Sequence, residues 1–368
     1  MPNCAPSARA RRRAPRASPP PKSSAPHHHR KEIPLLSDHA PDAIGRAIAQ
    51  AENILLVSHI RPDGDAVGSL LGLGWSLKAA GKNTQMVLND GVPHNLLYLP
   101  GSDEIQKKAR QSYDLSIVLD CSDLERSGKV FNDSLPPDIN IDHHPTNTAF
   151  ARYNLVESRS VATAEILARY IPQWGLPLPP EAASALLTGM LTDTLGFRTP
   201  NMKPDVLRLA ATLMEQGADL PTLYFRALVQ RDFQAVRLWG EGLRRLQRTG
   251  RIVWTTLTLE DKQLIDYSGR DDADLINVLS SIGDADIALI FVEQNAERVK
   301  ISWRSQQPFD ISQVAVHFGG GGHKNAAGAE VTGTLEDVQE RVLLATQAAW
   351  ESQAARLHQG EALVVPAG

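Results

Sequence analysis

Short unbroken apolar runs alternate with segments of helical periodicity over the first half of the chain. Residues 53–57 (Asn-Ile-Leu-Leu-Val) do not alternate with polar residues, which is typical of a strand buried on both faces. Residues 66–80 then repeat apolar side chains at helical spacing and stop before Gly81, a common helix terminator. This alternation predicts an α/β domain with a parallel sheet. Further strands are expected at 84–88, 113–119 and 139–141, and further helices at 42–51 and 181–192.

The second half uses the same two patterns in a different order. Helical segments come first, and apolar strands and a long final helix follow, which predicts a helical connector and then a smaller α/β domain. The expected helices are 203–216, 220–229, 233–248 and 335–354, and the expected strands are 252–257, 286–292 and 299–304. We therefore predict a leader at 1–38, a first domain at 39–200, a connector at 201–235, a second domain at 236–350 and a tail at 351–368.

The composition is that of an ordinary globular protein, with 42% hydrophobic and 22% charged residues in a chain of 368. No stretch approaches the roughly 20 apolar residues that span a bilayer, so we expect no membrane anchor. The two cysteines, Cys4 and Cys121, give no disulfide framework and suit a reducing compartment. These features predict a cytoplasmic protein.

The formal charge of −4 is unevenly distributed. Residues 1–31 hold eight Lys or Arg and no acidic residue, so a basic segment precedes an acidic remainder. A basic segment could contact nucleic acid or an acidic membrane surface. Its Pro, Ala and Ser content favours a disordered leader or an over-long start, since such a composition cannot bury a core. No apolar region follows the arginines, which argues against a signal peptide.

Polar clusters follow three of the predicted strands in the first half. The carboxyl ends of parallel strands meet at one edge of a sheet, and ligands of open α/β sheets bind at that edge. We therefore expect the clusters to form a single site. They consist of His59, Asp63 and Asp65 after strand 53–57, Asp120 after strand 113–119, and Asp142, His143 and His144 after strand 139–141.

A further carboxylate, Asp193, lies at the C-terminal end of the predicted helix 181–192. A negative charge is unfavourable there, against the helix dipole, unless a cation lies beside it. With the clusters at the strand ends it completes an oxygen-rich set containing some imidazole, which suits Mn²⁺ or Mg²⁺ better than a closed zinc site. Two divalent ions bridged by a carboxylate are a common solution for the attack of water on phosphorus, and Asp120 is the expected bridge. Imidazole ligands favour Mn²⁺ over Mg²⁺.

Taken in order, these motifs resemble those of the DHH phosphoesterase superfamily. Any one of them alone is weak evidence, because a lone Asp at a strand end is usually a cap and a lone Asp-His-His is usually a surface feature. Four in sequence, each at the end of a predicted element, favour the family. The resemblance covers about residues 40–345. The motifs read His59-x-x-x-Asp63-x-Asp65, Asp120, Asp142-His143-His144 and Asp193.

The resemblance implies two divalent ions, held in the catalytic first domain, and a water that attacks the phosphorus in line. Asp120 would belong to both ions and is counted among the catalytic residues. The implied ligands of one ion are His59, Asp63 and Asp120, and those of the other are Asp65, Asp120, His143 and Asp193.

A glycine run at 319–322 precedes His323 in the second predicted domain. Such a run is often a flexible linker. A linker rarely continues into His-Lys-Asn-Ala-Ala-Gly, so we favour a nest of backbone amides that binds a phosphate or a carboxylate. The run also resembles the substrate-binding Gly-Gly-Gly-His loop of the DHHA1 domain. The substrate-binding residues implied here are Gly320, Gly321, Gly322 and His323.

Three further residues receive roles from the same resemblance. His144 would donate a hydrogen bond to the scissile phosphate, and Asp142 would orient its neighbours. Arg304, at the end of a predicted strand, would hold a terminal phosphate together with His323, so that the domains enclose a short slot for short substrates. The alternative for Arg304 is a charge on the surface at the strand end.

Within the superfamily the chain resembles the stand-alone NrnA-like group, described as bifunctional oligoribonucleases and 3′-phosphoadenosine-5′-phosphate (pAp) phosphatases. An exonuclease of the RecJ type would need further nucleic-acid-binding domains. Family II pyrophosphatases carry a Ser-Arg-Lys-Lys-Gln-like segment where this chain has Ser302-Trp303-Arg304-Ser305. Membrane-bound cyclic-dinucleotide phosphodiesterases have transmembrane and sensor regions upstream, and we find none here.

The resemblance therefore implies hydrolysis of short RNA or DNA oligonucleotides to mononucleotides and of pAp to AMP, by a protein that could be a homodimer. An aromatic content of 5% and an acidic remainder argue against a groove for long nucleic acid. A soluble phosphodiesterase for linear or cyclic dinucleotides, such as pApA or cyclic di-AMP, stays open as an alternative. A non-catalytic nucleotide-binding module is the second alternative, and the full ligand set argues against it.

Overall fold

The computed structural model describes residues 40–131, 136–269 and 271–358. Contacts divide the chain after Gln230 into two compact units, which are described separately below. The predicted leader lies outside the described residues, and so does most of the predicted tail. The domain boundaries expected at 200 and 235 remain predictions. None of the described helices is long and apolar enough to span a bilayer.

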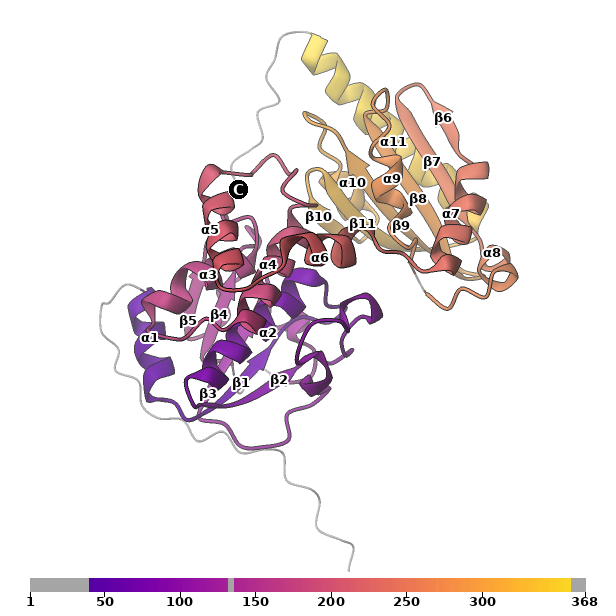
Figure 1. Cartoon of the computed structure of the whole chain (residues 1–368). Helices are drawn as coiled ribbons and strands as arrows, with labels where there is room; N and C mark the ends of the chain where they lie inside the picture. The colour runs from indigo at the N-terminus through magenta and orange to yellow at the C-terminus, as the bar shows by residue number, and fades with distance from the viewer. Residues whose placement is uncertain (1–39, 132–135, 270, 359–368) are drawn as a thin grey trace, which may run out of the picture. The chain divides into compact units, whose positions relative to one another are not determined.

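The first unit is built on a five-stranded sheet in the order β2-β1-β3-β4-β5, in which all neighbouring strands are parallel (Figure 1). From β1 the chain continues to β2 on one side and then to β3 on the other. The order therefore reverses between β1 and β3, and ligands bind at the carboxyl ends of strands at such a point. The strands are β1 (Asn53–Val57), β2 (Asn83–Val87), β3 (Leu115–Leu119), β4 (Ile139–Asp142) and β5 (Tyr153–Val156).

Helices cover one face of this sheet, and loops cover the other. Ile54 and Ile117 on the strands share the main core with residues of α1, α2, α3 and α4. Val57 and Val118 point to the opposite face, where they pack against loop residues such as Phe131. The helices are α1 (Ala40–Gln50), α2 (Gly64–Ala79), α3 (Thr163–Gln173), α4 (Pro180–Asp193), α5 (Pro204–Glu215) and α6 (Leu220–Tyr224).

Glycines allow α2 and α4 to touch directly. A Cβ atom on Gly68 would lie 2.8 Å from the backbone nitrogen of Gly189, which is closer than a side chain can approach. A Cβ atom on Gly64, at the start of α2, would collide with Thr192 near the end of α4. The two helices are therefore antiparallel, and their close contact brings Asp193 to the turn before α2.

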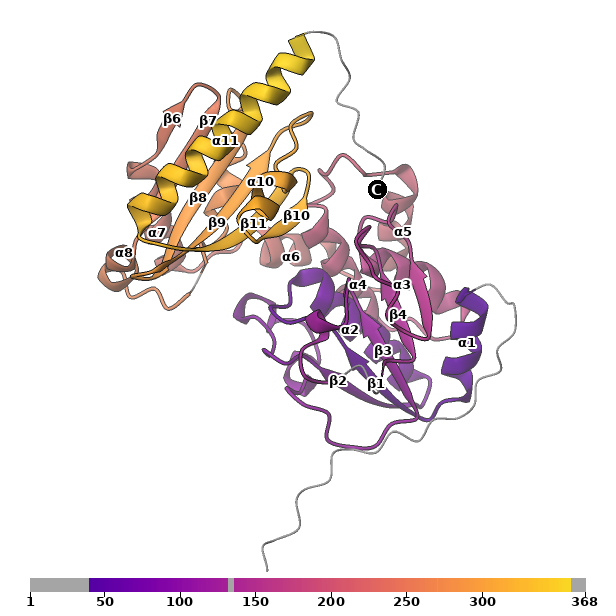
Figure 2. The ribbon, with the colours of Figure 1, turned by 180° about the vertical axis from the view of Figure 1, so that it is seen from behind.

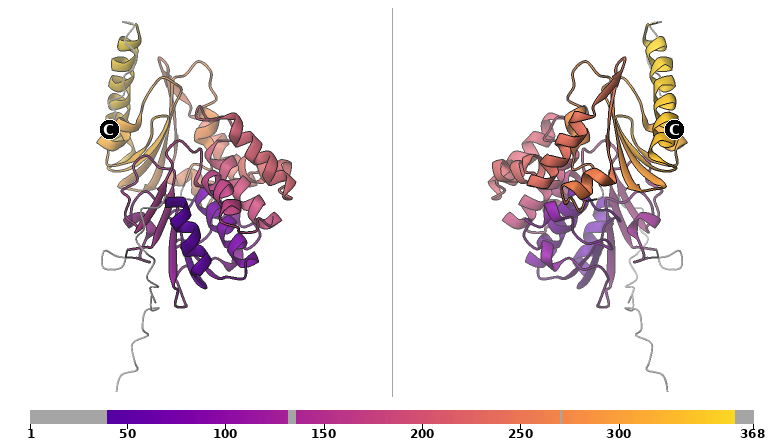
Figure 3. Two further views of the ribbon diagram at one scale, coloured as in Figure 1. Left: turned by 90° about the vertical axis from the view of Figure 1, so that its left-hand side faces the viewer. Right: turned by 90° about the vertical axis from the view of Figure 1, so that its right-hand side faces the viewer.

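The second unit contains a six-stranded sheet in the order β10-β11-β9-β8-β7-β6, in which only β7 and β8 are parallel. α10 and α11 pack on one face, and α7 and α9 on the other, each pair over its own core (Figures 2 and 3). The strands are β6 (Gln247–Thr249), β7 (Ile252–Leu257), β8 (Ile287–Asn295), β9 (Arg298–Ser305), β10 (Gly321–His323) and β11 (Ala326–Thr332). The helices are α7 (Phe233–Arg244), α8 (Leu259–Leu264), α9 (Leu275–Leu279), α10 (Ser312–His317) and α11 (Leu335–His358).

These two sheets confirm the predicted α/β class, with a parallel sheet in the first unit, but the helix predicted at 233–248 is too long. α7 ends at Arg244, and the chain then enters β6. The buried face of α7 consists of Ala235, Leu238 and Gly242, and two of these are too small to give an apolar signal. The other apolar positions that supported the long helix are exposed: Val236, Leu243 and Leu246.

The glycine run predicted as an anion-binding loop forms a β-hairpin of β10 and β11. The amides of Gly319 and Gly320 donate to the carbonyls of Val316 and Ala315 at the end of α10. Gly322 has a φ angle of +142°, which side-chain-bearing residues rarely adopt, so the hairpin itself requires this glycine. The amides of Gly319 and Gly320 are therefore engaged within the chain, and substrate binding by the glycine run remains a prediction.

Candidate metal centre

Three strand ends, the start of α2 and the end of α4 bring the predicted ligands together at the carboxyl edge of the first sheet. All six predicted metal ligands fall into clusters whose nitrogen and oxygen atoms lie within 4.8 Å of one another. The clusters are His59, Asp63 and Asp120; Asp65, His143 and Asp193; and Asp120, His143 and His144.

His59 presents an unpaired nitrogen to the first cluster. Its Nδ1 lies 2.9 Å from the carbonyl oxygen of Ile60, so this nitrogen carries the proton and Nε2 is left with a lone pair. Nε2 lies 3.5 Å from Asp120 Oδ2 and 3.8 Å from Asp63 Oδ1. It is buried and makes no hydrogen bond among the described residues. A buried orphan nitrogen between two carboxylates fits a cation bound by all three.

Asp120 lies between the clusters, with one oxygen toward each. Its Oδ2 faces His59, whereas its Oδ1 lies 3.7 Å from His143 Nε2. The backbone of Asp120 has a φ angle of +55°, in the left-handed region, directly after β3. Such strain is typical of functional sites. The geometry is that expected of a carboxylate bridging two ions.

His143 faces the second cluster through its other nitrogen. Nδ1 lies 3.4 Å from the carbonyl oxygen of Ser160, and Nε2 lies 3.2 Å from Asp193 Oδ2 and 4.0 Å from Asp65 Oδ2. The Ser160 hydroxyl is in turn contacted by Arg169 at 3.0 Å. This outer contact holds the loop that orients His143.

Asp65 is held by a helix that the sequence pattern does not predict. Its two oxygens accept hydrogen bonds from the backbone amides of Thr163 and Ala164, at 2.6 and 2.9 Å, at the start of α3. The Thr163 hydroxyl donates to Asp120 Oδ1 at 3.0 Å. The N-cap of α3 is Ala162, which has no capping side chain, so the sequence carries no signal for this helix start.

The buried carboxylates repel one another in the absence of a counter-charge. Burial and the charge of Asp120 raise the pKa of Asp65 well above its usual range, and burial and the charge of Asp65 do the same for Asp193. Without a bound cation, burial lowers the pKa of His59, but nearby Asp120 and Asp63 outweigh it and raise the pKa to about 10. A metal ion at Nε2 would take the place of the proton that those carboxylates otherwise hold there. Divalent cations would relieve this repulsion, so the donor set fits the predicted metal site.

His144 is oriented by Asp142 rather than by the metal cluster. Its Nδ1 lies 2.7 Å from Asp142 Oδ1, and Asp142 Oδ2 accepts a hydrogen bond of 2.6 Å from Asn147. Burial lowers the pKa of His144, but the bond to Asp142 outweighs it, and the pKa is raised. Asn147 completes this chain, and the motif gives no indication of its role.

Arg304 and His323 lie on one face of the second sheet. Ala326 on β11 pairs with Arg304 on one side and with His323 on the other. Directly opposed residues of antiparallel strands share a face, so the two side chains project from the same surface, two strand spacings or about 10 Å apart. The small residue Ala326 lies between them on β11.

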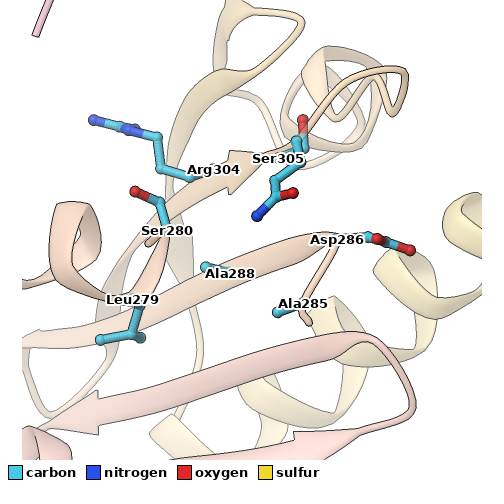
Figure 4. A pocket seen from close by; sticks show the side chains of 8 residues that line it. Leu279, Ser280, Ala285, Asp286, Ala288, Arg304 and Ser305 are labelled. Atoms are coloured by element: carbon cyan, nitrogen blue, oxygen red, sulfur yellow. The ribbon is translucent and has the colours of Figure 1, made fainter. Parts of the chain in front are cut away.

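The Arg304 side chain is half-buried, unlike an exposed charge at a strand end. It lines a small recess with Ser280 and Ser305, and the Asp286 carboxylate of that recess points away from it (Figure 4). Arg304 Nη1 donates to the Trp303 carbonyl at 3.0 Å, but Nε is buried without a partner and no ion pair forms among the described residues. Burial lowers the pKa of Arg304. An incoming anion would pair this guanidinium.

Two family models match the chain in order, the DHH family N-terminal domain at 53–190 and the DHHA1 domain at 264–351. The bifunctional oligoribonuclease and PAP phosphatase NrnA of Thermus thermophilus is 34% identical over 299 residues, 80% of this chain and 89% of the relative. NrnA of Mycoplasma genitalium is 28% identical over 295 residues, 78% of this chain and 91% of the relative.

A solved structure matches both units. The exopolyphosphatase-related protein from Bacteroides fragilis has a TM-score of 0.76 and 27% identity, over 85% of this chain and 96% of that one. The matched DHH segment carries His59, Asp120 and Asp142 to His144, and the matched DHHA1 segment carries Arg304 and His323. From the two domains and the relative at 34% identity it follows that the chain belongs to the DHH–DHHA1 family that includes NrnA.

Proposed function

We propose that this protein is a metal-dependent phosphoesterase that hydrolyses short oligonucleotides to mononucleotides and pAp to AMP. The observation that carries the proposal is the set of carboxylates and imidazoles joined through Asp120, most of them buried or half-buried, which has the chemistry of a two-ion phosphoesterase site. Relatives named bifunctional oligoribonuclease and PAP phosphatase extend over the same two domains, which supports this substrate class.

The ligand sets follow the geometry of the clusters. One ion would be held by His59, Asp63 and Asp120, and the other by Asp65, Asp120, His143 and Asp193. Mn²⁺ is the preferred ion, because imidazole favours it over Mg²⁺. Divalent ions held there supply a water of lowered pKa and neutralise the charge that develops on the phosphate.

The chain's own groups orient the reaction. Asp142 holds the Nδ1 proton of His144, so that Nε2 can donate to an oxygen of the scissile phosphate. Asp120 keeps an oxygen toward each cluster. These contacts exist before substrate binds, which reduces the reorganisation needed in the transition state.

The second unit contributes substrate binding. Arg304 offers a planar guanidinium with a buried unpaired Nε, which suits a terminal phosphate. His323 lies on the same face, and Gly321, Gly322 and Gly320 let a substrate approach the backbone closely. A cytoplasmic location and a homodimer remain predictions.

The alternative is a phosphodiesterase for linear or cyclic dinucleotides, which would use the same ions and the same phosphate-binding Arg304. Substrate preference separates the two. The purified full chain is assayed with Mn²⁺ against pAp, a linear dinucleotide, a long single-stranded RNA, cyclic di-AMP and pyrophosphate. We expect pAp and the dinucleotide to be hydrolysed far faster than the long RNA and pyrophosphate.

Two results of this assay would change the proposal. Preference for cyclic di-AMP over pAp and the linear dinucleotide would favour the alternative. Equal rates on the dinucleotide and the long RNA, or a preference for pyrophosphate, would overturn the proposed substrate class.

A further inference from the structure

α3 begins at the metal centre and is capped by a residue from another helix. Its N-cap, Ala162, provides no side-chain hydrogen bond, and the amides of Thr163 and Ala164 donate to the two oxygens of Asp65 instead. Asp65 belongs to the first turn of α2. The start of α3 therefore fixes both oxygens of one proposed metal ligand.

The side chain of the same residue binds a second carboxylate. Thr163 is fully buried, and its hydroxyl donates to Asp120 Oδ1 at 3.0 Å. That oxygen faces His143, whereas the other oxygen of Asp120 faces His59. A donor on Oδ1 alone resists rotation of the carboxylate, so each oxygen of Asp120 stays on its own side of the centre.

We propose that Thr163 is a positioning residue that aligns the two central carboxylates, through its amide on Asp65 and its hydroxyl on Asp120. The inference rests on the proposed function, because the aligned oxygens are taken to be ion ligands. A buried threonine in a helix commonly returns its hydroxyl to a carbonyl of its own helix, as Thr188 does to Ser184 in α4. Thr163 instead donates to a carboxylate 43 residues away in the sequence.

The test separates the hydroxyl from the backbone. Thr163→Val removes the hydroxyl and keeps the shape and the amide, whereas Thr163→Ser keeps the hydroxyl. Binding of Mn²⁺ to the metal-free full chain is measured by calorimetry without substrate. We expect Thr163→Val to raise the Kd for Mn²⁺ by about 10- to 100-fold, the usual cost of losing an outer partner of a metal ligand. The Kd of Thr163→Ser should stay within about threefold of wild type. In Thr163→Val, kcat should fall as the Kd for Mn²⁺ rises, while the KM for pAp should change little.

Thr188→Val is the matched control, because it also removes a buried hydroxyl from a helix of the first unit, but one bonded to a backbone carbonyl. It should leave the Kd for Mn²⁺ unchanged. Circular dichroism of the metal-free chain shows whether Thr163→Val folds. If it does not, Thr163→Ala is used as the variant without the hydroxyl and is compared with Thr163→Ser.

An unchanged Kd in the variants that lack the Thr163 hydroxyl would overturn the inference. Equal losses in Thr163→Ser and Thr163→Val would also overturn it, because the hydroxyl would then be irrelevant. Failure of the wild-type chain to bind Mn²⁺ would instead overturn the metal centre and the proposed function. The wild-type measurement therefore distinguishes a failure of the proposed function from a failure of the role given to Thr163.

Discussion

Two acids of the second unit are paired with arginines of the same chain, whereas the acids of the metal centre are not. In the second unit Asp261 forms a two-bond pair with Arg245, and Asp286 pairs with Arg251 at 2.8 Å. In the first unit no Lys or Arg among the described residues pairs with the acids of the metal centre, which contact histidines, one another and the uncharged donors at the start of α3. An acid that is paired within the chain supports the fold, whereas a group of unpaired acids requires a cation from outside.

Arg304 in the second unit carries an unpaired charge of the opposite sign to the acids of the metal centre. There the half-buried guanidinium of Arg304 forms no ion pair with an acid among the described residues, and its Nε has no hydrogen-bond partner among them. Its Nη1 donates a hydrogen bond to the carbonyl of Trp303, at 3.0 Å. The same reasoning assigns cations to the first unit and an anion to Arg304, which are the two things that a phosphoesterase must bind.

The largest effect should follow from removing the shared ligand. Asp120→Ala takes away the carboxylate that faces both clusters, so both proposed ions lose a ligand at once. We expect kcat on pAp to fall by about 10³-fold or more, since ion-based charge stabilisation contributes several kcal/mol. Turnover and bound Mn²⁺ are measured on the same preparations.

Asp261→Asn is the control for this variant, because it alters an acid that is paired within the chain, in the other unit. It should leave kcat almost unchanged. If Asp120→Ala retained more than a few per cent of wild-type turnover with its metal content unchanged, the two-ion interpretation would be untenable.

The position of the metal centre could be predicted because its signals are local. Apolar runs end directly before His59 and Asp120, and parallel strands place such ends at one edge. The partner of Asp65 could not be predicted in this way. Thr163 lies 98 residues further along the chain, and the helix that carries it begins without a capping side chain. Contacts of that kind are set by how helices pack, and no local pattern encodes them.

In the second unit, too, the contacts that could not be predicted are those set by backbone packing. The glycine run is evident in the sequence, but the amides of Gly319 and Gly320 donate hydrogen bonds to carbonyls at the end of α10. The hairpin also brings Gly320 so close to Gly328 that no side chain would fit, and the sequence does not show this contact. The burial of Arg304 likewise depends on which face of β9 it occupies. Strand register decides that face, and a shift of one residue would reverse it.

A smaller effect should follow from Arg304→Ala. Loss of the guanidinium should raise KM for pAp by about 10- to 100-fold, which corresponds to the 1.5–3 kcal/mol typical of a charged hydrogen bond. Binding of Mn²⁺ should not change, because Arg304 belongs to the second unit and the ion ligands to the first. Steady-state kinetics on pAp and on bis-p-nitrophenyl phosphate, which has no terminal phosphate, provide the comparison.

Arg298→Ala is the matched control, since Arg298 lies on the same strand but is paired with Glu330 at 3.1 Å. It should leave KM unchanged. Equal losses on the two substrates would assign Arg304 to the fold or to the transition state. An unchanged KM for pAp in Arg304→Ala would remove it from the binding site.

The smallest effect should be on the free energy of unfolding, through the ion pair of Asp261 and Arg245 in the second unit. Burial raises the pKa of Asp261, but Arg245 and the Thr258 amide outweigh it, so the pKa lies below its ordinary value. A lowered folded-state pKa gives stability that is present above the ordinary value near 3.9 and is lost as the pH falls below it. Asp261→Asn should therefore cost about 1–2 kcal/mol at pH 7, because Arg245 is partly exposed, and less at about pH 3.

This cost is measured by hydrogen exchange while the metal-free full chain is unfolded in urea. The amides of β7 report on the second unit, and the amides of β1 provide the reference in the first unit. The variant should lose protection in β7 at a lower urea concentration than wild type at pH 7, with the difference narrowing at pH 3. A difference of the same size at both pH values would show that the loss does not come from the charge of Asp261. No difference at either pH would show that Asp261 acts only through its bond to the Thr258 amide, which an asparagine oxygen can also accept. A loss of protection confined to β1 would show that Asp261 does not stabilise the second unit, which would contradict the role given to its ion pair with Arg245.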